Sequence, residues 1–109
     1  MRHLTLLAFL SLFVGAAMAD AGLAAVGELG RLNGQALACD EKAVVSQIKA
    51  LMIRYSPKTR RYGEIFEEQS SAAFLAQGER ECPATADFNS RVDEMAQRLP
   101  AVLPLGPPQ

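Results

Sequence analysis

Two cysteines, Cys39 and Cys82, constrain the fold of this chain most, because they are its only cysteines and lie far apart. Their spacing is not that of a redox Cys-x-x-Cys motif. If they are bonded, the long loop they close disfavours the unfolded state by about 4 kcal/mol in the chain-entropy model. Such a bond is typical of an exported protein. We therefore expect one structural disulfide, and the alternative is two free thiols, one of them reactive.

The N-terminal segment has the pattern of a secretory signal peptide. Arg2 and His3 provide a basic start, and Leu4–Val14 is an uninterrupted apolar run. This run is shorter than the roughly 18 residues that a membrane-spanning helix needs. Ala17-Met18-Ala19 is a small-x-small cleavage site. We expect cleavage after Ala19, and the alternative is an uncleaved, buried N-terminal helix.

Removal of residues 1–19 from the 109 residues leaves 90 residues without a histidine, since the only one is His3. A chain without histidine cannot use a Ser-His-Asp triad, a Cys-His pair or a His-ligated zinc ion. The full chain has a net charge of −1, whereas a nucleic-acid-binding protein of this size would carry a basic excess. We therefore expect that the chain is not an enzyme and binds no cofactor, metal or nucleic acid. We also expect no stable membrane insertion after signal cleavage.

The mature chain shows helical periodicity in four stretches and no convincing strand. We expect helices over residues 20–38, 40–55 and 57–77, a fourth helix that starts at Pro83 or Thr85 and ends at Leu99, and a Pro-rich extended tail over 100–109. Gly30 and Gly34 form a Gly-x-x-x-Gly pair within the first stretch. In water this pair indicates either a close helix crossing or a break of the helix near Asn33-Gly34.

Capping residues set the expected helix boundaries. Asp40 is a good N-cap for the second helix, and Ser56-Pro57 would cap and start the third. Gly78 should end the third helix. The fourth should end at Leu99, because Pro100 follows it.

These stretches predict an all-α fold, a small three- or four-helix bundle pinned by one disulfide. In an up-down-up-down arrangement the first and third corners lie at the same end, and the two cysteines fall at these corners. We expect the domains to be a signal peptide (1–19), a helical domain (20–99) and the tail (100–109). In the core, the apolar stripe of the fourth helix should pack against residues of the second and third helices. The stripe consists of Phe88, Val92, Met95 and Leu99, and its expected neighbours are Ile48, Leu51 and Phe66.

Two short patterns have simple structural explanations. Ser46 and Lys49 match the Ser-x-x-Lys pattern of penicillin-recognising enzymes, but its companion motifs are missing, so we interpret them as surface residues. Glu64, Glu67 and Glu68 are too few for a hard-cation site and are interpreted as a solvated face.

The best candidate for a specific site is the basic corner before the third helix. Cations near a helix N-terminus oppose the helix dipole, so their presence there indicates a role other than folding. Arginine and tyrosine are also common in protein interfaces. We therefore expect a partner protein with an acidic surface to bind a set of five residues: Tyr55, Lys58, Arg60, Arg61 and Tyr62.

These features predict a small periplasmic or secreted helical protein that acts by protein–protein binding, as a chaperone, an inhibitor or an immunity protein. The alternative is a carrier that holds an apolar small molecule between its helices. In size, export signal and single disulfide the chain resembles small periplasmic acid-stress chaperones and toxin-immunity proteins, but no sequence motif assigns it to either family.

Overall fold

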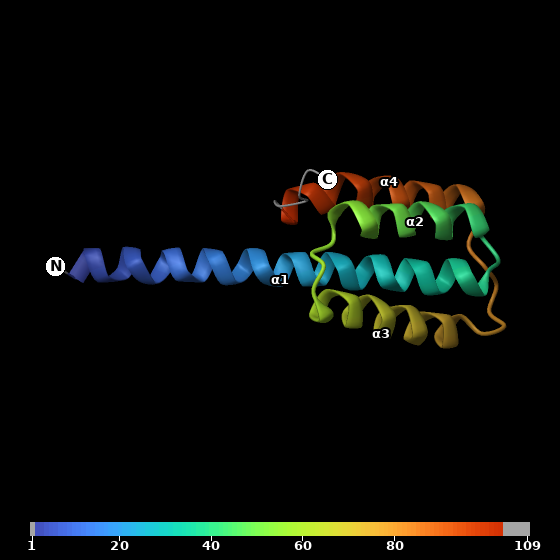
Figure 1. The fold of residues 1–109 in the computed structure, drawn as a ribbon, viewed down its shortest axis with the longest axis horizontal. Coiled ribbons are helices and arrows are strands. Elements are labelled where there is room, and N and C mark those ends of the chain that lie inside the picture. Colours follow the sequence, from blue (N-terminus) through green and yellow to red (C-terminus); the bar gives the residue numbers. More distant parts are fainter. Residues whose placement is uncertain (1, 104–109) are drawn as a thin grey trace.

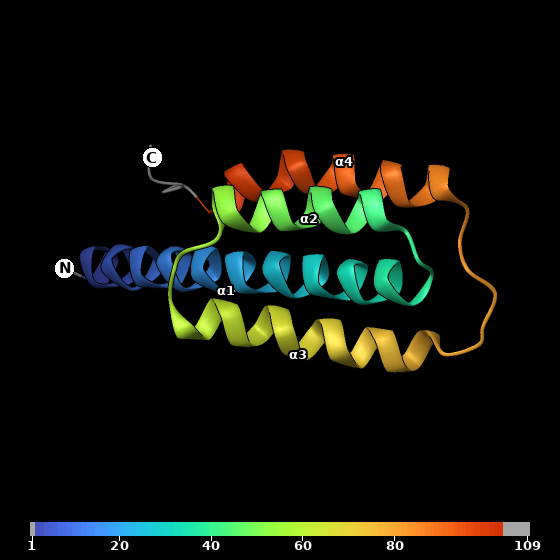
Figure 2. The same cartoon turned by 45° about the vertical axis from the view of Figure 1, so that its right-hand side comes forward.

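The computed structural model describes the backbone of residues 2–103 and the side chains from Asp20 to Leu103. It is all-helical over residues 2–103, with four helices: α1 (Arg2–Ala38), α2 (Lys42–Tyr55), α3 (Arg60–Gln77) and α4 (Thr85–Val102). Helix α1 is central, with α3 on one side of it and α2 and α4 on the other (Figures 1 and 2). The predicted disulfide-pinned helical bundle is therefore confirmed.

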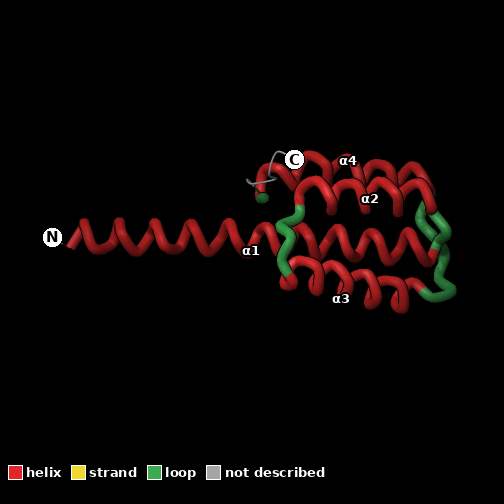
Figure 3. Tube along the Cα trace, in the orientation of Figure 1, coloured by secondary structure: helices red, strands yellow, loops and turns green. Residues whose placement is uncertain are grey.

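Helix α1 is continuous, so the expected alternative of a break near Asn33-Gly34 is wrong. Its N-terminal half projects beyond the other three helices, and its C-terminal half forms the axis of the bundle (Figure 3). The other helices begin to cover α1 near Gly22, where the Tyr62 hydroxyl and the side chain of Leu103 pack.

The core lies between α1, α2 and α4. The predicted stripe of α4 is buried and meets Val44 and Ile48 of α2 and the apolar face of α1. Leu51 is only half-buried at the edge of this core. Phe66 is also half-buried, because the backbone of α3 comes close to that of α1 and not to those of α2 and α4. Phe66 therefore packs at the edge of the predicted core and not in its interior.

Helix α3 crosses α1 at very close range, as the first interpretation of Gly30 and Gly34 predicted. A Cβ atom at Gly30 would lie 2.7 Å from the carbonyl oxygen of Phe66, and one at Gly34 would overlap the carbonyl oxygen of Ser70. The Ser70 hydroxyl donates to the Gly30 carbonyl oxygen at 3.0 Å and accepts from the Asn33 amide at 3.1 Å. The buried residues of α3 are polar, Ser70 and Gln77. Backbone proximity and polar bonds thus hold α3 in place.

The junction between α1 and α2 differs from our prediction. Asp40 is not the N-cap of α2; it has a positive φ of 56° and ends α1. The amide of Asp40 bonds to the carbonyl oxygen of Leu37, and the amide of Glu41 bonds to that of Ala36. This is a Schellman motif with aspartate where glycine is usual. The N-cap position of α2 passes to Glu41, whose side chain makes no cap hydrogen bond.

Helix α3 begins three residues later than predicted, at Arg60 rather than Pro57. Ser56 is the C-cap of α2, with its amide bonded to the carbonyl oxygen of Met52, and is not the cap of α3. The chain must cross from α2 to the opposite side of α1 before α3 can start, so residues 56–59 are needed as a connection (Figure 3). Gly78, with a φ of 48°, ends α3 as predicted.

Helix α4 continues through Pro100 to Val102, so the predicted end at Leu99 was wrong. Proline lacks an N–H, which costs one hydrogen bond of the last turn. The extra turn carries Leu103 into the core, where it is 6% exposed, and this burial offsets the loss. Residues 100–102 are thus helical, and the rest of the predicted extended tail, 104–109, lies outside the described residues.

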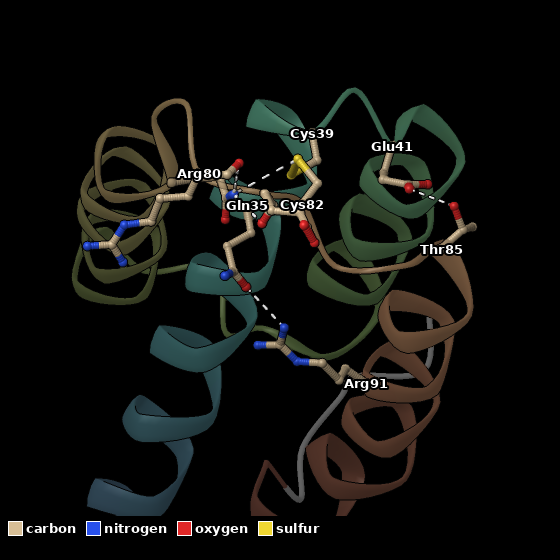
Figure 4. Close-up of a disulfide and its surroundings, with 9 residues drawn as sticks. Gln35, Cys39, Glu41, Arg80, Cys82, Thr85 and Arg91 are labelled. Carbon is tan, nitrogen blue, oxygen red and sulfur yellow. Dashed lines mark hydrogen bonds between the residues drawn. A yellow bond between two sulfur atoms is a disulfide. The ribbon is translucent and has the colours of Figure 1, made fainter.

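The disulfide between Cys39 and Cys82 is present, with Cα atoms 5.8 Å apart. It joins the end of α1 to the segment that enters α4, the two corners that the topology prediction placed together. Figure 4 shows two further links near it, from Thr85 to the Glu41 carboxylate at 2.7 Å and from Arg91 to Gln35 at 3.0 Å.

Candidate protein-binding groove

The two aromatic residues of the predicted corner pack within the fold. Tyr55 and Tyr62 are half-buried and pack against the core. The guanidinium of Arg54 lies over the Tyr55 ring at 5.3 Å from its centre. The Tyr62 hydroxyl lies against Gly22 of α1. Each ring therefore has a structural role.

The three cations of the corner have different surroundings. The Lys58 ammonium donates to the carbonyl oxygens of Met52 and Ile53, at 3.2 and 2.6 Å, and so neutralises the negative end of α2. Arg60 is highly exposed and lies 4.0 Å from the Glu64 carboxylate. Arg61 is exposed and lines a polar cleft between α1 and α3. The structure places all three near the 56–59 connection, and Lys58 has a structural explanation there.

An apolar groove between α2 and α3 was missed by sequence reasoning. Four large apolar side chains are exposed in the described part of the chain, and all four line this groove: Leu37 (49% exposed), Ile53 (65%), Phe74 (47%) and Leu75 (77%). Its volume is about 570 Å³. A groove lined by exposed apolar side chains is a candidate surface for a binding partner.

The groove exists because α2 and α3 both pack on α1, while no Cα atom of one lies within 8 Å of a Cα atom of the other. Asn33 and Leu37 of α1 line the groove between residues of α2 and α3. Figure 2 shows α1 running between these two helices. Two charged residues line it, Lys49 on α2 and Glu67 on α3. The groove continues as a shallow extension past Gly63, which both charged residues also line.

The opposite face of the bundle is polar and internally bonded. Arg98 is paired with Glu28, and Arg31 donates to Gln69 at 3.2 Å. Such mutually satisfied groups explain a polar surface without a ligand. Within residues 20–103 no three side chains of metal-binding type come together, and Glu64, Glu67 and Glu68 form no such group. None of the described helices is both long and apolar enough to cross a membrane.

The sequence does contain a signal for this groove. Ile53 falls off the apolar stripe of α2, and Leu75 is an apolar residue near the end of α3, whose other side is polar. Apolar residues outside the main stripe of a helix indicate a second contact surface.

No family model, no curated protein and no solved structure matches this chain. The geometry of the groove is therefore the main basis for assigning a function.

Proposed function

We propose that this chain is a small exported helical protein that acts by binding another protein, with the α2–α3 groove as the binding surface. The observation that carries the proposal is the concentration of every exposed large apolar side chain of the described part in one groove. Helix-in-groove recognition uses surfaces of this shape and composition. Chaperone, inhibitor and immunity roles all fit such a surface.

Export, to the periplasm or beyond the cell, is supported by two observations. The disulfide is typical of an oxidising compartment. In addition, the proposed cleavage after Ala19 falls close to Gly22, where the packing of α3 and α4 on α1 begins. Removal of residues 1–19 would therefore leave the bundle whole.

The test is affinity capture from the exported fraction with wild-type protein and with Leu75→Glu. Leu75 is 77% exposed, so this change should leave the fold intact while it places a charge in the groove. The matched control is Ala76→Glu, also exposed on α3 but outside the groove. We expect the captured protein to be retained by wild type and control and lost with Leu75→Glu. Equal capture by all three would reject the groove as the binding surface.

A carrier of an apolar small molecule is the second candidate. The groove volume of about 570 Å³ lies within the range of ligand pockets, about 300–1,000 Å³. Native mass spectrometry of the purified protein distinguishes the two functions. A bound small molecule that is lost in Leu75→Glu would favour the carrier. A mass equal to that of the chain alone would favour protein binding.

The basic corner remains a further proposed contact for an acidic partner surface. Arg60 and Arg61 are the cations there that do not bond to backbone carbonyl groups. We expect Arg60→Ala with Arg61→Ala to keep the fold and weaken association with the captured protein, more so at low salt because salt screens exposed charges. Unchanged affinity would show that these arginines form only a solvated face.

A further inference from the structure

The two walls of the groove end in rows of residues spaced by four, which form ridges on a helix surface. On α2 the row is Val45, Lys49 and Ile53, all of which line the groove. On α3 the row begins at Gly63 and continues through Glu67 to Ser71 and Leu75. Both ridges are exposed except at Val45, which is half-buried against the core.

The two rows are in register across the groove. Lys49 and Glu67 both line the groove and its extension. Lys49 lies six residues before the end of α2, and Glu67 lies seven residues after the start of α3, so the two stand at similar distances from the 56–59 connection. Helices α2 and α3 are antiparallel (Figure 1), so the next residue of each row toward the 56–59 connection is Ile53 on α2 and Gly63 on α3. A step of four residues is about 6 Å on either helix, which places these two at equal height.

We propose that the partner seated on this groove is a second copy of the same chain, related by a twofold axis that runs parallel to the helices. This inference rests on the proposed function, since it needs the groove to be a protein-binding surface, and it names the partner. Such an axis keeps each residue at its own height and places the α2 ridge of each copy against the α3 ridge of the other.

Charge selects this axis over the alternative that runs across the groove. An axis across the groove would place Lys49 against Lys49 and Glu67 against Glu67. The axis along the groove places Lys49 of each copy against Glu67 of the other, and no salt bridge within the described residues uses either side chain. Like charges facing each other are unfavourable at an interface, and opposite charges fix its register.

Size is matched in the same arrangement. Ile53, which is 65% exposed, meets Gly63 of the second copy, where a Cβ atom would have nothing within 4 Å. Val45 meets Ser71 of the second copy. At the Ile53–Gly63 position a large exposed side chain on one ridge thus faces open space on the other, as in interdigitated helices.

The dimer also supplies α3 with the neighbour it lacks. In the single chain the backbone of α3 lies close to that of α1 alone, and α3 fully buries no large apolar side chain. Packing of α2 from a second copy along residues 63–71 of α3 would supply a second neighbour.

The test is sedimentation equilibrium of the purified, disulfide-bonded protein up to about 200 µM, with charge reversal across the proposed contact. We expect a reversible dimer. Lys49→Glu alone and Glu67→Lys alone should each raise the dimer dissociation constant at least about tenfold, because each creates a like-charge pair. The double change should restore the dissociation constant to within about threefold of wild type.

Two further variants test the steric fit at the ridge and the effect of a charge change outside the groove. Gly63→Leu fills open space in the single chain and should keep its circular dichroism and not lower its melting temperature, yet block the dimer by occupying the place of Ile53. Asp93→Lys, exposed on α4 away from the groove, should leave the dimer unchanged. A wild-type protein that stays monomeric at every concentration, or a dimer that the charge reversals and Gly63→Leu do not weaken, would overturn the proposal.

Failure of this inference is distinguishable from failure of the proposed function. A monomeric protein that still captures a different protein, and loses it with Leu75→Glu, keeps the groove as a binding surface but rejects the second copy. A monomer whose capture is unaffected by Leu75→Glu rejects both.

Discussion

At Gly30 and Gly34 the absence of side chains lets the backbone of α3 approach α1 closely. The nearest atoms to a Cβ at Gly34 belong to the backbone of α3, namely the carbonyl oxygen of Ser70 and the amide nitrogen of Phe74. Backbone atoms inside a helix cannot move separately, so any side chain at Gly34 would push the whole helix away. Gly63 is the opposite case, because a Cβ there meets nothing.

Gly34→Ala should therefore destabilise the fold by about 2–3 kcal/mol through overpacking. The matched change Gly63→Ala should stabilise it by about 0.5–1 kcal/mol, since alanine is the better helix former. Urea unfolding at low protein concentration measures both free energies. A gain of stability in both variants would contradict the close crossing.

Asp40 occupies a backbone conformation that favours glycine, with a φ of 56°. Asp40→Gly should raise the free energy of unfolding by about 0.5–1 kcal/mol, because the Cβ atom is unfavourable in the left-handed region. Asp40→Ala keeps the Cβ atom and should give no such gain. Thermal unfolding followed by circular dichroism compares them, and equal stabilisation by Gly and Ala would contradict the left-handed conformation.

Among the helices, α2 and α4 are held on α1 by apolar burial and α3 by a different means. Phe88 of α4 is fully buried, whereas Phe66 of α3 is only partly covered. The Asn33–Ser70–Gly30 hydrogen bonds fix the position of α3. A helix held in this way can leave its apolar residues free for a partner.

Phe88→Ala should cost about 3–5 kcal/mol of stability, the usual value for a fully buried phenylalanine. Phe66→Ala should cost clearly less, because its ring lies at the edge of the core and lines the groove. Denaturant unfolding gives both values. If Phe66→Ala cost as much as Phe88→Ala, α3 would belong to the main core.

At the scale of the whole molecule, the disulfide closes the loop that contains α2 and α3. Residues Cys39 and Cys82 are 43 apart in sequence, and their bond ties the end of α1 to the start of the last helix. The bond therefore holds the segment that follows α3 against the end of α1.

Replacement of both cysteines by serine should reduce stability by about 4 kcal/mol, the chain-entropy value for a loop of this length. The variant should be less stable but keep the same helices. Thiol titration of the unfolded, unreduced wild-type protein should find no free thiol. Two titratable thiols would show that the bond does not form in the protein as made.

The sequence by itself determined the helices, their order and the disulfide. Helical periodicity is a local property, so stripes such as Phe88, Val92, Met95 and Leu99 predicted which face of α4 is buried. The corner argument paired the two cysteines correctly because topology alone brings the first and third corners to one end. The Gly30–Gly34 pair predicted a close helix crossing without saying which helix would cross.

Only the tertiary structure decided how these helices share the surface of α1. The helix ends at Ser56 and Pro100 departed from local capping rules because long-range packing set them: the chain had to cross α1 before α3 began, and Leu103 had to reach the core. The groove likewise depends on a contact that is missing, between α2 and α3. Periodicity reports which residues of a helix are apolar, but which of them remain exposed depends on where the neighbouring helices lie.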